Sequence, residues 1–230
     1  MQREMRARLE SLPKTEASFV EPMECLSVSK LPEGLEWLWE IKLDGYRALA
    51  VKSGNGVTLF SRRRKSLNRQ FPYIVEALAD LPAGTVVDGE VVAVCESGRP
   101  DFNLLQKFRA DASRIQYYIF DLLCWKDRDL TRVPMVERRA LLKSVVVIGD
   151  ERIRIADYFE AAPKGLLSAV REQGLEGIIG KRKDSVYQPG KRSGAWIKYR
   201  VNRGQEFVIG GTRYFPQERQ YAYHALGGCL

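Results

Sequence analysis

The sequence predicts an α+β fold in which antiparallel-rich sheets are flanked by helices. Short segments rich in β-branched and aromatic residues alternate with turn residues, a pattern typical of hairpins. Helical segments fall between them at irregular intervals, which argues against a regular βαβ succession. With 230 residues, 45% of them hydrophobic, the chain can bury a sizeable core.

The first half is expected to open with a helix over residues 1–12, where apolar residues share one face. A hairpin is predicted around Asn55-Gly56, a dipeptide that favours tight turns. A second helix is expected over residues 71–81. The expected strands of this half cover residues 37–43, 47–52, 57–61 and 85–94.

In the second half, three helices and four strands are expected. Asp101 is a candidate N-cap for a helix over 102–108, and Pro134 suits the start of a helix that ends near Ser144. A helix over 163–173 is expected to stop at Gly174. The expected strands cover residues 115–123, 177–181, 195–201 and 206–210.

The net charge of +8 is concentrated in two stretches of the sequence. Residues 42–69 hold eight basic side chains and one acidic one, and residues 171–213 hold ten basic and four acidic ones. If the fold brings these stretches together, they form a surface for polyphosphate or a nucleic-acid backbone. Two ordinary solvated faces are the alternative.

Several classes of protein are disfavoured. No apolar run reaches the length of a membrane span, and the charged N-terminus lacks the apolar core of a signal peptide, so we expect a cytoplasmic protein. The four cysteines form no CxxC pair and there is one histidine, which argues against structural zinc and Ser-His catalysis. The glycine-rich phosphate-loop patterns are also absent.

The predicted strand that ends near Lys42 carries the most informative chemistry. Strand alternation would place Glu40, Lys42 and Asp44 on one face. A lysine attacks only as a neutral amine, and lowering its pKa from about 10.4 to near 7 takes about 4–5 kcal/mol. Burial and cations such as Arg47 and Lys198 act in that direction. An exposed, ion-paired lysine is the ordinary alternative.

Lys42-Leu43-Asp44-Gly45-Tyr46-Arg47 resembles the KxDGxR motif of the covalent nucleotidyltransferases, which include ATP-dependent DNA ligases, RNA ligases and mRNA capping enzymes. Five further family motifs follow in order, matched by Ser61-Arg62, Asp88-Gly89-Glu90, Tyr118–Leu123, Glu176–Lys181 and Trp196–Arg200. The resemblance covers about residues 18–212. It is strongest to the adenylation domain of bacterial ATP-dependent DNA ligases, including the ligase modules of end-joining proteins, because Gln205–Gly211 also fits them.

The resemblance implies roles for individual residues. Lys42 would attack the α-phosphorus of ATP and hold AMP, and Lys198 would neutralise charge on that phosphate as the second catalytic residue. The implied nucleotide-binding residues are Glu40, Lys42, Arg47, Arg62, Glu90, Phe120, Lys181, Lys198 and Arg200. Within this set Glu40 would read the adenine edge and Phe120 would stack on the base. The implied Mg²⁺ ligands are Glu90 and Glu176, and the implied DNA contacts are Arg62, Arg63, Arg64 and Lys65.

The resemblance also implies a domain plan and partners. We expect an N-terminal extension over 1–17, the adenylation domain over 18–204, and the start of a truncated OB-fold domain over 205–230. The tail is too short for a complete five-stranded barrel, so the OB-fold domain is expected to be essentially missing. The expected substrate is nicked double-stranded DNA, with other end-joining or repair proteins as further partners of a monomer that binds no membrane.

Two other functions stay open at this point. An RNA ligase or a capping-type guanylyltransferase shares the KxDG core. A non-catalytic nucleic-acid-binding module would keep the fold and the basic surface without turnover, and the short tail is compatible with it. A further departure is Lys198-Tyr199-Arg200 where the family often has Lys-x-Lys, because guanidinium and ammonium groups contact phosphate differently.

Overall fold

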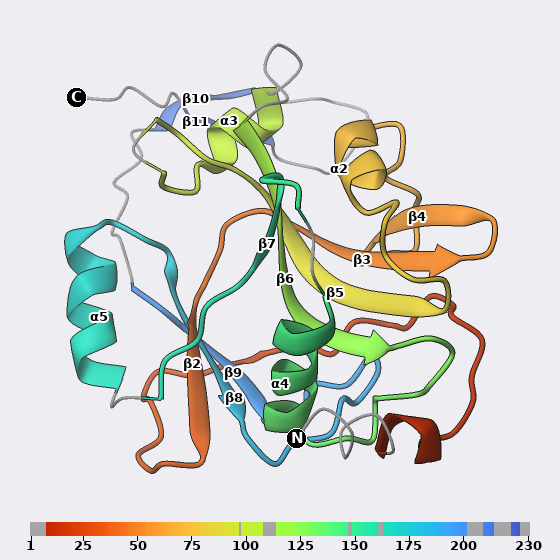
Figure 1. Cartoon of the computed structure of the whole chain (residues 1–230). Helices are drawn as coiled ribbons and strands as arrows, with labels where there is room; N and C mark the ends of the chain where they lie inside the picture. The colour runs from red at the N-terminus through yellow and green to blue at the C-terminus, as the bar shows by residue number, and fades with distance from the viewer. Residues whose placement is uncertain are drawn as a thin grey trace.

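The computed structural model describes residues 8–96, 98–107, 114–146, 149–160 and 163–201, together with the two strands Ile209–Arg213 and Ala222–Ala225. Its described part contains a five-stranded sheet, a four-stranded sheet and a two-stranded sheet (Figure 1). Most strand pairs are antiparallel and helices flank the two larger sheets. The predicted α+β class is therefore confirmed.

The five-stranded sheet has the order β4-β3-β5-β6-β7, and its only parallel pair among the described residues is β6 with β7. The strands are β3 (Tyr46–Ser53), β4 (Gly56–Ser61), β5 (Thr85–Ala93), β6 (Ile115–Cys124) and β7 (Ile153–Ile155). Three helices pack on it, α2 (Pro72–Ala77) on β4 and β6, α3 (Phe102–Lys107) on β5 and α4 (Met135–Val145) on β6. Arg47, Glu90 and Phe120 of this sheet line a pocket that opens between the two larger sheets.

The four-stranded sheet has the order β1-β9-β8-β2. Its strands are β1 (Leu26–Ser27), β2 (Trp37–Ile41), β8 (Gly177–Arg182) and β9 (Trp196–Arg200). Helix α5 (Pro163–Glu172) lies against β8, as Figure 1 shows on the left of the molecule. This sheet joins segments separated by about 140 residues in sequence, because β2 pairs with β8 from Trp37↔Arg182 to Ile41↔Ile178.

Buried apolar side chains form three clusters, one of which joins the two larger sheets. The largest lies between the five-stranded sheet and the helices α2, α3 and α4, and the smallest lies beneath α5. The joining cluster contains Leu49 and Phe120 from the five-stranded sheet, Trp196 from the four-stranded sheet, and the loop residues Met23 and Tyr187. Because this cluster underlies the pocket, burial of its apolar surface also fixes the position of both pocket walls.

Local sequence signals located most elements. The hairpin β3–β4 closes where Ser53 pairs with Gly56, and Asp101 Oδ1 accepts hydrogen bonds from the amides of Asn103 and Leu104 as the predicted N-cap. Gly174 ends the α5 segment with a φ of 67°. The segment 71–81 is helical only over Pro72–Ala77 and continues as tight turns.

Four predictions touch residues beyond those described, one of them the helix over 102–108, whose last residue lies outside the described part. The N-terminal helix is seen over residues 8–11, and its residues 1–7 lie outside the described part. The last predicted strand is observed as β10 (Ile209–Arg213), paired with β11 (Ala222–Ala225), while residues 206–208 are not described. The domain plan with a boundary at 204/205 stays a prediction. Within the described helices, none is long and apolar enough to cross a lipid bilayer.

Candidate active site

A pocket opens where the two larger sheets meet, and it collects most of the predicted nucleotide-binding residues. Six cationic side chains line it, namely Lys42, Arg47, Arg62, Lys181, Arg192 and Lys198. Three carboxylates do so as well, namely Glu24, Glu40 and Glu90. Phe120, Ile179 and Trp196 supply apolar surface. The cationic excess inside a partly apolar cleft suits a ligand that has a flat apolar part and a phosphate tail.

Lys42 lies on the wall between this pocket and a second one. Its Nζ is 2.5 Å from Glu176 Oε2, and its side chain is 18% exposed. The second pocket, lined by Asp44, Glu176 and Arg200 among others, shares Lys42 with the first. The predicted common face of Glu40, Lys42 and Asp44 is therefore split, because β2 ends at Ile41 and strand alternation stops there.

Strand register brings Lys42 and Glu176 together. Strand β8 begins at Gly177, opposite both the end of β2 and Arg200 of β9, and the Lys42 amide donates to Gly177 O at 2.9 Å. Gly177 has no room for a side chain, since a Cβ there would lie 2.1 Å from Tyr199 O. Glu176 is thus placed between Lys42 and Arg200, and it accepts a 2.9 Å hydrogen bond from Arg200 Nε.

Glu40 is buried and faces two cations. Lys181 Nζ lies 2.7 Å from Glu40 Oε2, and Arg139 Nη2 lies 3.7 Å from Oε1. Burial lowers the pKa of Lys181, although Glu40 opposes that effect. Glu40 Oε1 accepts no hydrogen bond from the described residues. The pocket wall therefore offers a buried acceptor, Glu40 Oε1, beside a buried donor, Lys181 Nζ.

Phe120 forms an aromatic surface in the pocket. Lys181 Nζ is 4.2 Å and Arg47 Cζ is 4.8 Å from the centroid of its ring. Arg47 itself is held by Asp88, with Nε–Oδ1 at 2.8 Å and Nη2–Oδ2 at 2.6 Å. The fully buried Asp88 also accepts a 2.7 Å hydrogen bond from Tyr187. Arg47, which the resemblance implies as a nucleotide-binding residue, thus has its guanidinium oriented by a buried carboxylate.

Glu90 and Lys198 have pKa values shifted toward their neutral forms. Burial raises the pKa of Glu90 to about 8, while Arg47 and Lys42 act against that shift. Burial also lowers the pKa of Lys198, and the neighbouring Arg200 and Lys42 lower it further. Both shifts have burial as their largest cause, because a site shielded from water disfavours the charged form of a side chain.

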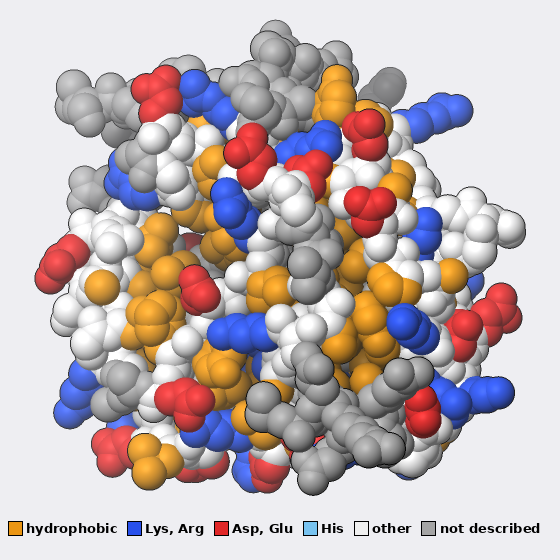
Figure 2. Space-filling model, in the orientation of Figure 1, with side chains coloured by type: hydrophobic (Ala, Val, Ile, Leu, Met, Phe, Trp, Pro, Cys, Tyr) orange, Lys and Arg blue, Asp and Glu red, His pale blue; other side chains and the backbone are white. Residues whose placement is uncertain are grey.

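The remaining predicted residues lie at or beyond the edge of the pocket. Arg62, Arg63, Arg64 and Lys65 are exposed in the turn after β4, and only Arg62 of these lines the pocket. The Arg64 guanidinium carbon lies 5.6 Å from the Phe19 ring centroid. Arg200 lines the second pocket and not the first. Figure 2 shows Lys and Arg interspersed with acidic and hydrophobic side chains on the face it presents.

The predicted metal ligands do not form a preassembled metal cage. No group of three or more His, Cys, Asp or Glu side chains with suitable placement occurs in the part of the chain that is described. Glu90 and Glu176 nevertheless offer hard carboxylate oxygens near Lys42, the donor type that Mg²⁺ prefers. Because Mg²⁺ usually keeps several waters and binds substrate phosphates, two carboxylates are chemically compatible with it.

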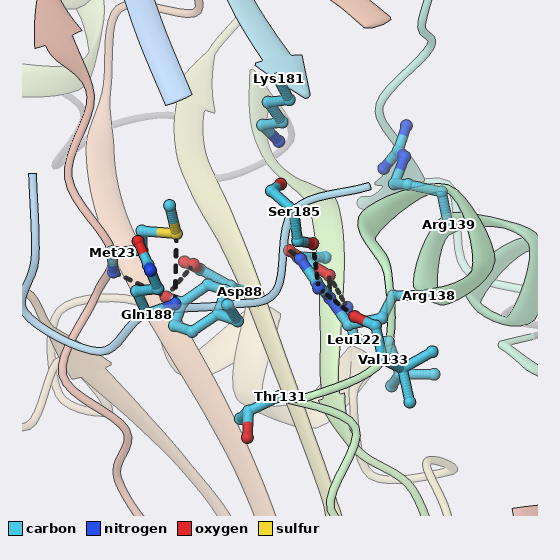
Figure 3. Close-up of polar contacts among 12 residues, drawn as sticks. Met23, Asp88, Leu122, Thr131, Val133, Arg138, Arg139, Lys181, Ser185 and Gln188 are labelled. Atoms are coloured by element: carbon cyan, nitrogen blue, oxygen red, sulfur yellow. Dashed lines mark hydrogen bonds and ion pairs between the residues drawn. The ribbon is translucent and has the colours of Figure 1, made fainter. Parts of the chain in front are cut away.

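A buried polar network supports the floor of the pocket. Arg138 of α4 is fully buried and holds Asp121 through two hydrogen bonds of 2.8 and 2.7 Å. It also donates to the carbonyls of Val133 and Ser185, between which it lies in Figure 3. Asp121 follows Phe120 directly, so this network fixes the strand that carries the aromatic surface.

Sequence reasoning missed several pocket residues. Glu24, Cys25, Arg192 and Trp196 line the pocket without having been assigned a role, and Arg139 contacts Glu40 from α4. Arg192 had a weak signal, because it belongs to the second basic stretch and lies just before strand β9. Glu24 had no sequence signal, because a single carboxylate in a loop belongs to no motif and no periodic pattern.

The fold and the lysine-centred pocket place the chain among the covalent nucleotidyltransferases. Comparison with known proteins narrows this class. Residues 20–200 match the family model described as the ATP dependent DNA ligase domain. The chain belongs to the family of ATP-dependent DNA ligase domains.

Two relatives and one solved structure illustrate the likeness. The multifunctional non-homologous end joining protein LigD of Pseudomonas aeruginosa is 38% identical over 192 residues, covering 82% of this chain and 23% of that protein. The LigD protein of Mycolicibacterium smegmatis is 35% identical over 192 residues, covering 83% of this chain and 25% of that protein. The solved structure of mycobacterial DNA ligase D complexed with ATP and MES has a TM-score of 0.70 and 33% identity, covering 84% of this chain and 64% of that one. The chain thus spans about a quarter of these curated relatives' lengths.

Proposed function

We propose that this chain forms a covalent lysyl–AMP adduct on Lys42 and passes AMP to the 5′-phosphate of nicked double-stranded DNA. The observation that carries the proposal is the position of Lys42, whose amine lies at the wall of a cationic pocket and 2.5 Å from Glu176. Such a placement supplies a nucleophile together with a group that orients it.

In the first step, the neutral Lys42 amine attacks the α-phosphorus of ATP. The new N–P bond forms as the P–O bond to pyrophosphate breaks, and pyrophosphate departs with that electron pair. The amine proton is lost to a base or to water. Lys198 stabilises the charge that builds on the α-phosphate, and Arg62 contacts the phosphate tail.

In the second step, an oxygen of the DNA 5′-phosphate attacks the adenylate phosphorus, and the N–P bond to Lys42 breaks. The 3′-hydroxyl of the nick then attacks the activated 5′-phosphorus and AMP leaves. We assign the contacts with the DNA backbone to Arg62, Arg63, Arg64 and Lys65, and their exposure supports this assignment. End-joining or repair proteins as further partners belong to this proposal, supported by the names of the LigD relatives.

The pocket wall supports adenine as the base. Adenine presents an N6–H donor beside an N1 acceptor. Glu40 Oε1 can accept the first and Lys181 Nζ can donate to the second, while Phe120 offers a stacking surface. Guanine presents an acceptor where adenine has its N6–H donor, and a donor where adenine has its N1 acceptor. Glu40 and Lys181 are therefore expected to disfavour guanine in the same orientation.

Mg²⁺ is proposed as the divalent cofactor, held by Glu176 and Glu90 with substrate phosphates and water as the other ligands. Bound there, the ion supplies charge neutralisation for the polyphosphate. Glu176 orients Lys42 through its Oε2 atom in the same region. Replacing Glu176 by Gln should raise the Mg²⁺ concentration needed for half-maximal adduct formation, which a titration of adduct yield measures.

The test of the proposal is intact-mass measurement after incubation with ATP or GTP and Mg²⁺. We expect an AMP adduct on the wild-type chain and none on Lys42→Ala. Lys183→Ala is the matched control, because Lys183 also pairs with a glutamate, Glu160, at 2.8 Å but lies outside the pocket. A GMP adduct would point to a capping-type enzyme, and no adduct with either nucleotide would contradict the proposal. Transfer is then measured with nicked DNA against nicked RNA.

A further inference from the structure

A fully buried arginine, Arg139, lies beside the pocket and takes no part in the reaction proposed above. It comes from helix α4, as Arg138 does, but the two side chains leave the helix in different directions (Figure 3). Arg138 pairs with Asp121, which follows Phe120 in the chain. Arg139 pairs with Glu40 instead, with 3.7 Å between its Nη2 and Glu40 Oε1. Neighbouring residues of one helix therefore support the two groups assigned to the base.

The guanidinium group of Arg139 is held from two sides. Its Nη2 donates a hydrogen bond to Ala156 O, and its Cζ lies 5.3 Å from the centroid of the Tyr158 ring. Ala156 lines the pocket, and its amide donates to Ile119 O of β6 at 2.8 Å. These contacts fix the end of the Arg139 side chain next to the pocket wall that contains Glu40.

Arg139 differs from Arg138 in how many of its nitrogens form hydrogen bonds. All three nitrogens of Arg138 donate to described residues. Nε and Nη1 of Arg139 donate to none of them, and Glu40 is the only described residue whose carboxylate forms an ion pair with it. A buried cation with unused donors is costly, so a purely structural arginine is expected to resemble Arg138. The contact with Glu40 is the interaction that distinguishes Arg139.

The two oxygens of Glu40 face different cations at different distances. Lys181 Nζ lies 2.7 Å from Oε2, whereas the 3.7 Å from Arg139 to Oε1 is too long for a hydrogen bond. The terminal torsion of a glutamate is broad, so a cation beside each oxygen restrains the rotation of the carboxylate. Oε1 keeps its capacity to accept, because Arg139 attracts it without donating to it.

We propose that Arg139 is a positioning residue, which holds the Glu40 carboxylate so that Oε1 accepts the amino group of adenine. The inference deepens the proposed function, on which it rests for adenine as the base. Arg139 does not line the pocket and acts only through Glu40. Discrimination between purines with and without this amino group therefore depends on a residue that the nucleotide does not touch.

The probes are ATP and purine riboside 5′-triphosphate, which lacks the amino group. Calorimetry gives both affinities in a Lys42→Ala background, where no lysyl adduct can form at this position. We expect Arg139→Gln to weaken ATP binding about tenfold and binding of the purine analogue less than about twofold. Arg139→Lys keeps the charge but has a shorter reach, so the preference for ATP should fall by about threefold.

Kinetics of adduct formation in the chain that keeps Lys42 provide a second readout. In Arg139→Gln the KM for ATP should rise about tenfold with little change in kcat, because the contact with the base is the same before and during the chemical step. A merely structural role would lower the activity with both nucleotides alike.

Two matched controls separate positioning from stability. Arg138→Lys changes an equally buried arginine of the same helix that contacts Asp121 and not Glu40, so it should leave the preference for ATP unchanged. In a Glu40→Ala background, Arg139→Gln should not change the preference any further, because the group that Arg139 positions is missing.

The inference is overturned if Arg139→Gln weakens both nucleotides equally, or if its effect on the preference persists in Glu40→Ala. A chain with intact Arg139 that binds both nucleotides equally also overturns it. Thermal melts identify an Arg139→Gln chain that has lost its fold, and Arg139→Lys then carries the test, with an unchanged preference as the contradicting result. Absence of an AMP adduct on the wild-type chain refutes the proposed reaction, whereas the affinities in Lys42→Ala test Arg139 separately.

Discussion

Arg200 Nε contacts Glu176 Oε1 at 2.9 Å, while Lys42 contacts the other oxygen, Oε2, of the same carboxylate. Glu176 therefore links the proposed nucleophile, Lys42, to strand β9 of the four-stranded sheet. This geometry favours a positioning role for Arg200, which lines the second pocket and not the pocket that Lys198 lines. The nucleotide contact that the sequence resemblance implied for Arg200 stays a prediction.

Replacing Arg200 by Gln should slow adduct formation on Lys42. A charge-assisted hydrogen bond contributes about 1.5–3 kcal/mol, which corresponds to about tenfold or more in the rate of adenylation if Glu176 loses its orientation. Because Arg200 is largely exposed, the free energy of unfolding should change by less than about 1 kcal/mol. Single-turnover mass measurement gives the rate, and urea titration gives the stability. An adenylation rate that is unchanged in Arg200→Gln would contradict the positioning role of Arg200.

Breaking the buried pair between Arg138 and Asp121 should destabilise the fold strongly. Both side chains are fully buried, so Arg138→Met leaves an uncompensated carboxylate and is expected to cost about 3–5 kcal/mol of unfolding free energy. The double variant Arg138→Met with Asp121→Leu should recover much of that loss, because no buried charge remains. Chemical denaturation of the two variants measures the difference, and equal destabilisation would argue against the pair as the cause.

Replacing Gly45 by Ala should destabilise the chain and disturb the segment that carries Lys42. A Cβ at this position would lie 2.2 Å from Val91 O, so the backbone of β3 or β5 must move. Overpacking of this kind typically costs about 1–3 kcal/mol. Gly54→Ala is the matched control, since a Cβ there meets nothing within 4 Å. Denaturant midpoints compare the two variants, and equal midpoints would contradict the steric argument.

Glu90 should make stability decrease as pH rises. Burial raises its pKa from 4.5 to about 8, so the folded chain binds a proton that the unfolded chain has lost between these pH values. The free energy of unfolding should therefore fall from about pH 5 to pH 8, by at most about 1.4 kcal/mol per pH unit from this group. Subtracting the profile of Glu90→Gln isolates the contribution. If the difference in unfolding free energy between the wild type and Glu90→Gln does not change from pH 5 to pH 8, the raised pKa of Glu90 is contradicted.

Local patterns in the sequence could predict the elements but not the contacts between them. The hairpin at Asn55-Gly56, the cap at Asp101 and the stop at Gly174 depend on neighbouring residues only, and all three are observed. The segment 71–81 shows the limit of such signals. Its helix ends at Ala77 in the structure, before the turns that lead to Pro82.

The candidate site could be predicted as a set of residues, mainly through the resemblance to known motifs. Eight of the nine predicted nucleotide-binding residues line one pocket, with Arg200 outside it. The pairing of Lys42 with Glu176 depends on strand register between segments 134 positions apart. No local period encodes that register. The ion pair between Arg47 and Asp88 likewise depends on the pairing of β3 with β5.

The register around Gly177 has a consequence for changes of chain length. Inserting or deleting one residue between Glu176 and Lys181 would turn every following side chain of β8 to the opposite face. The loop between β8 and β9, in contrast, absorbs a change in length without moving the Lys42–Glu176 contact. Such a change would instead shift Arg192 relative to Glu24. Variation in the length of this loop would therefore alter the mouth of the pocket, which Arg192 lines, while Lys42 stays beside Glu176.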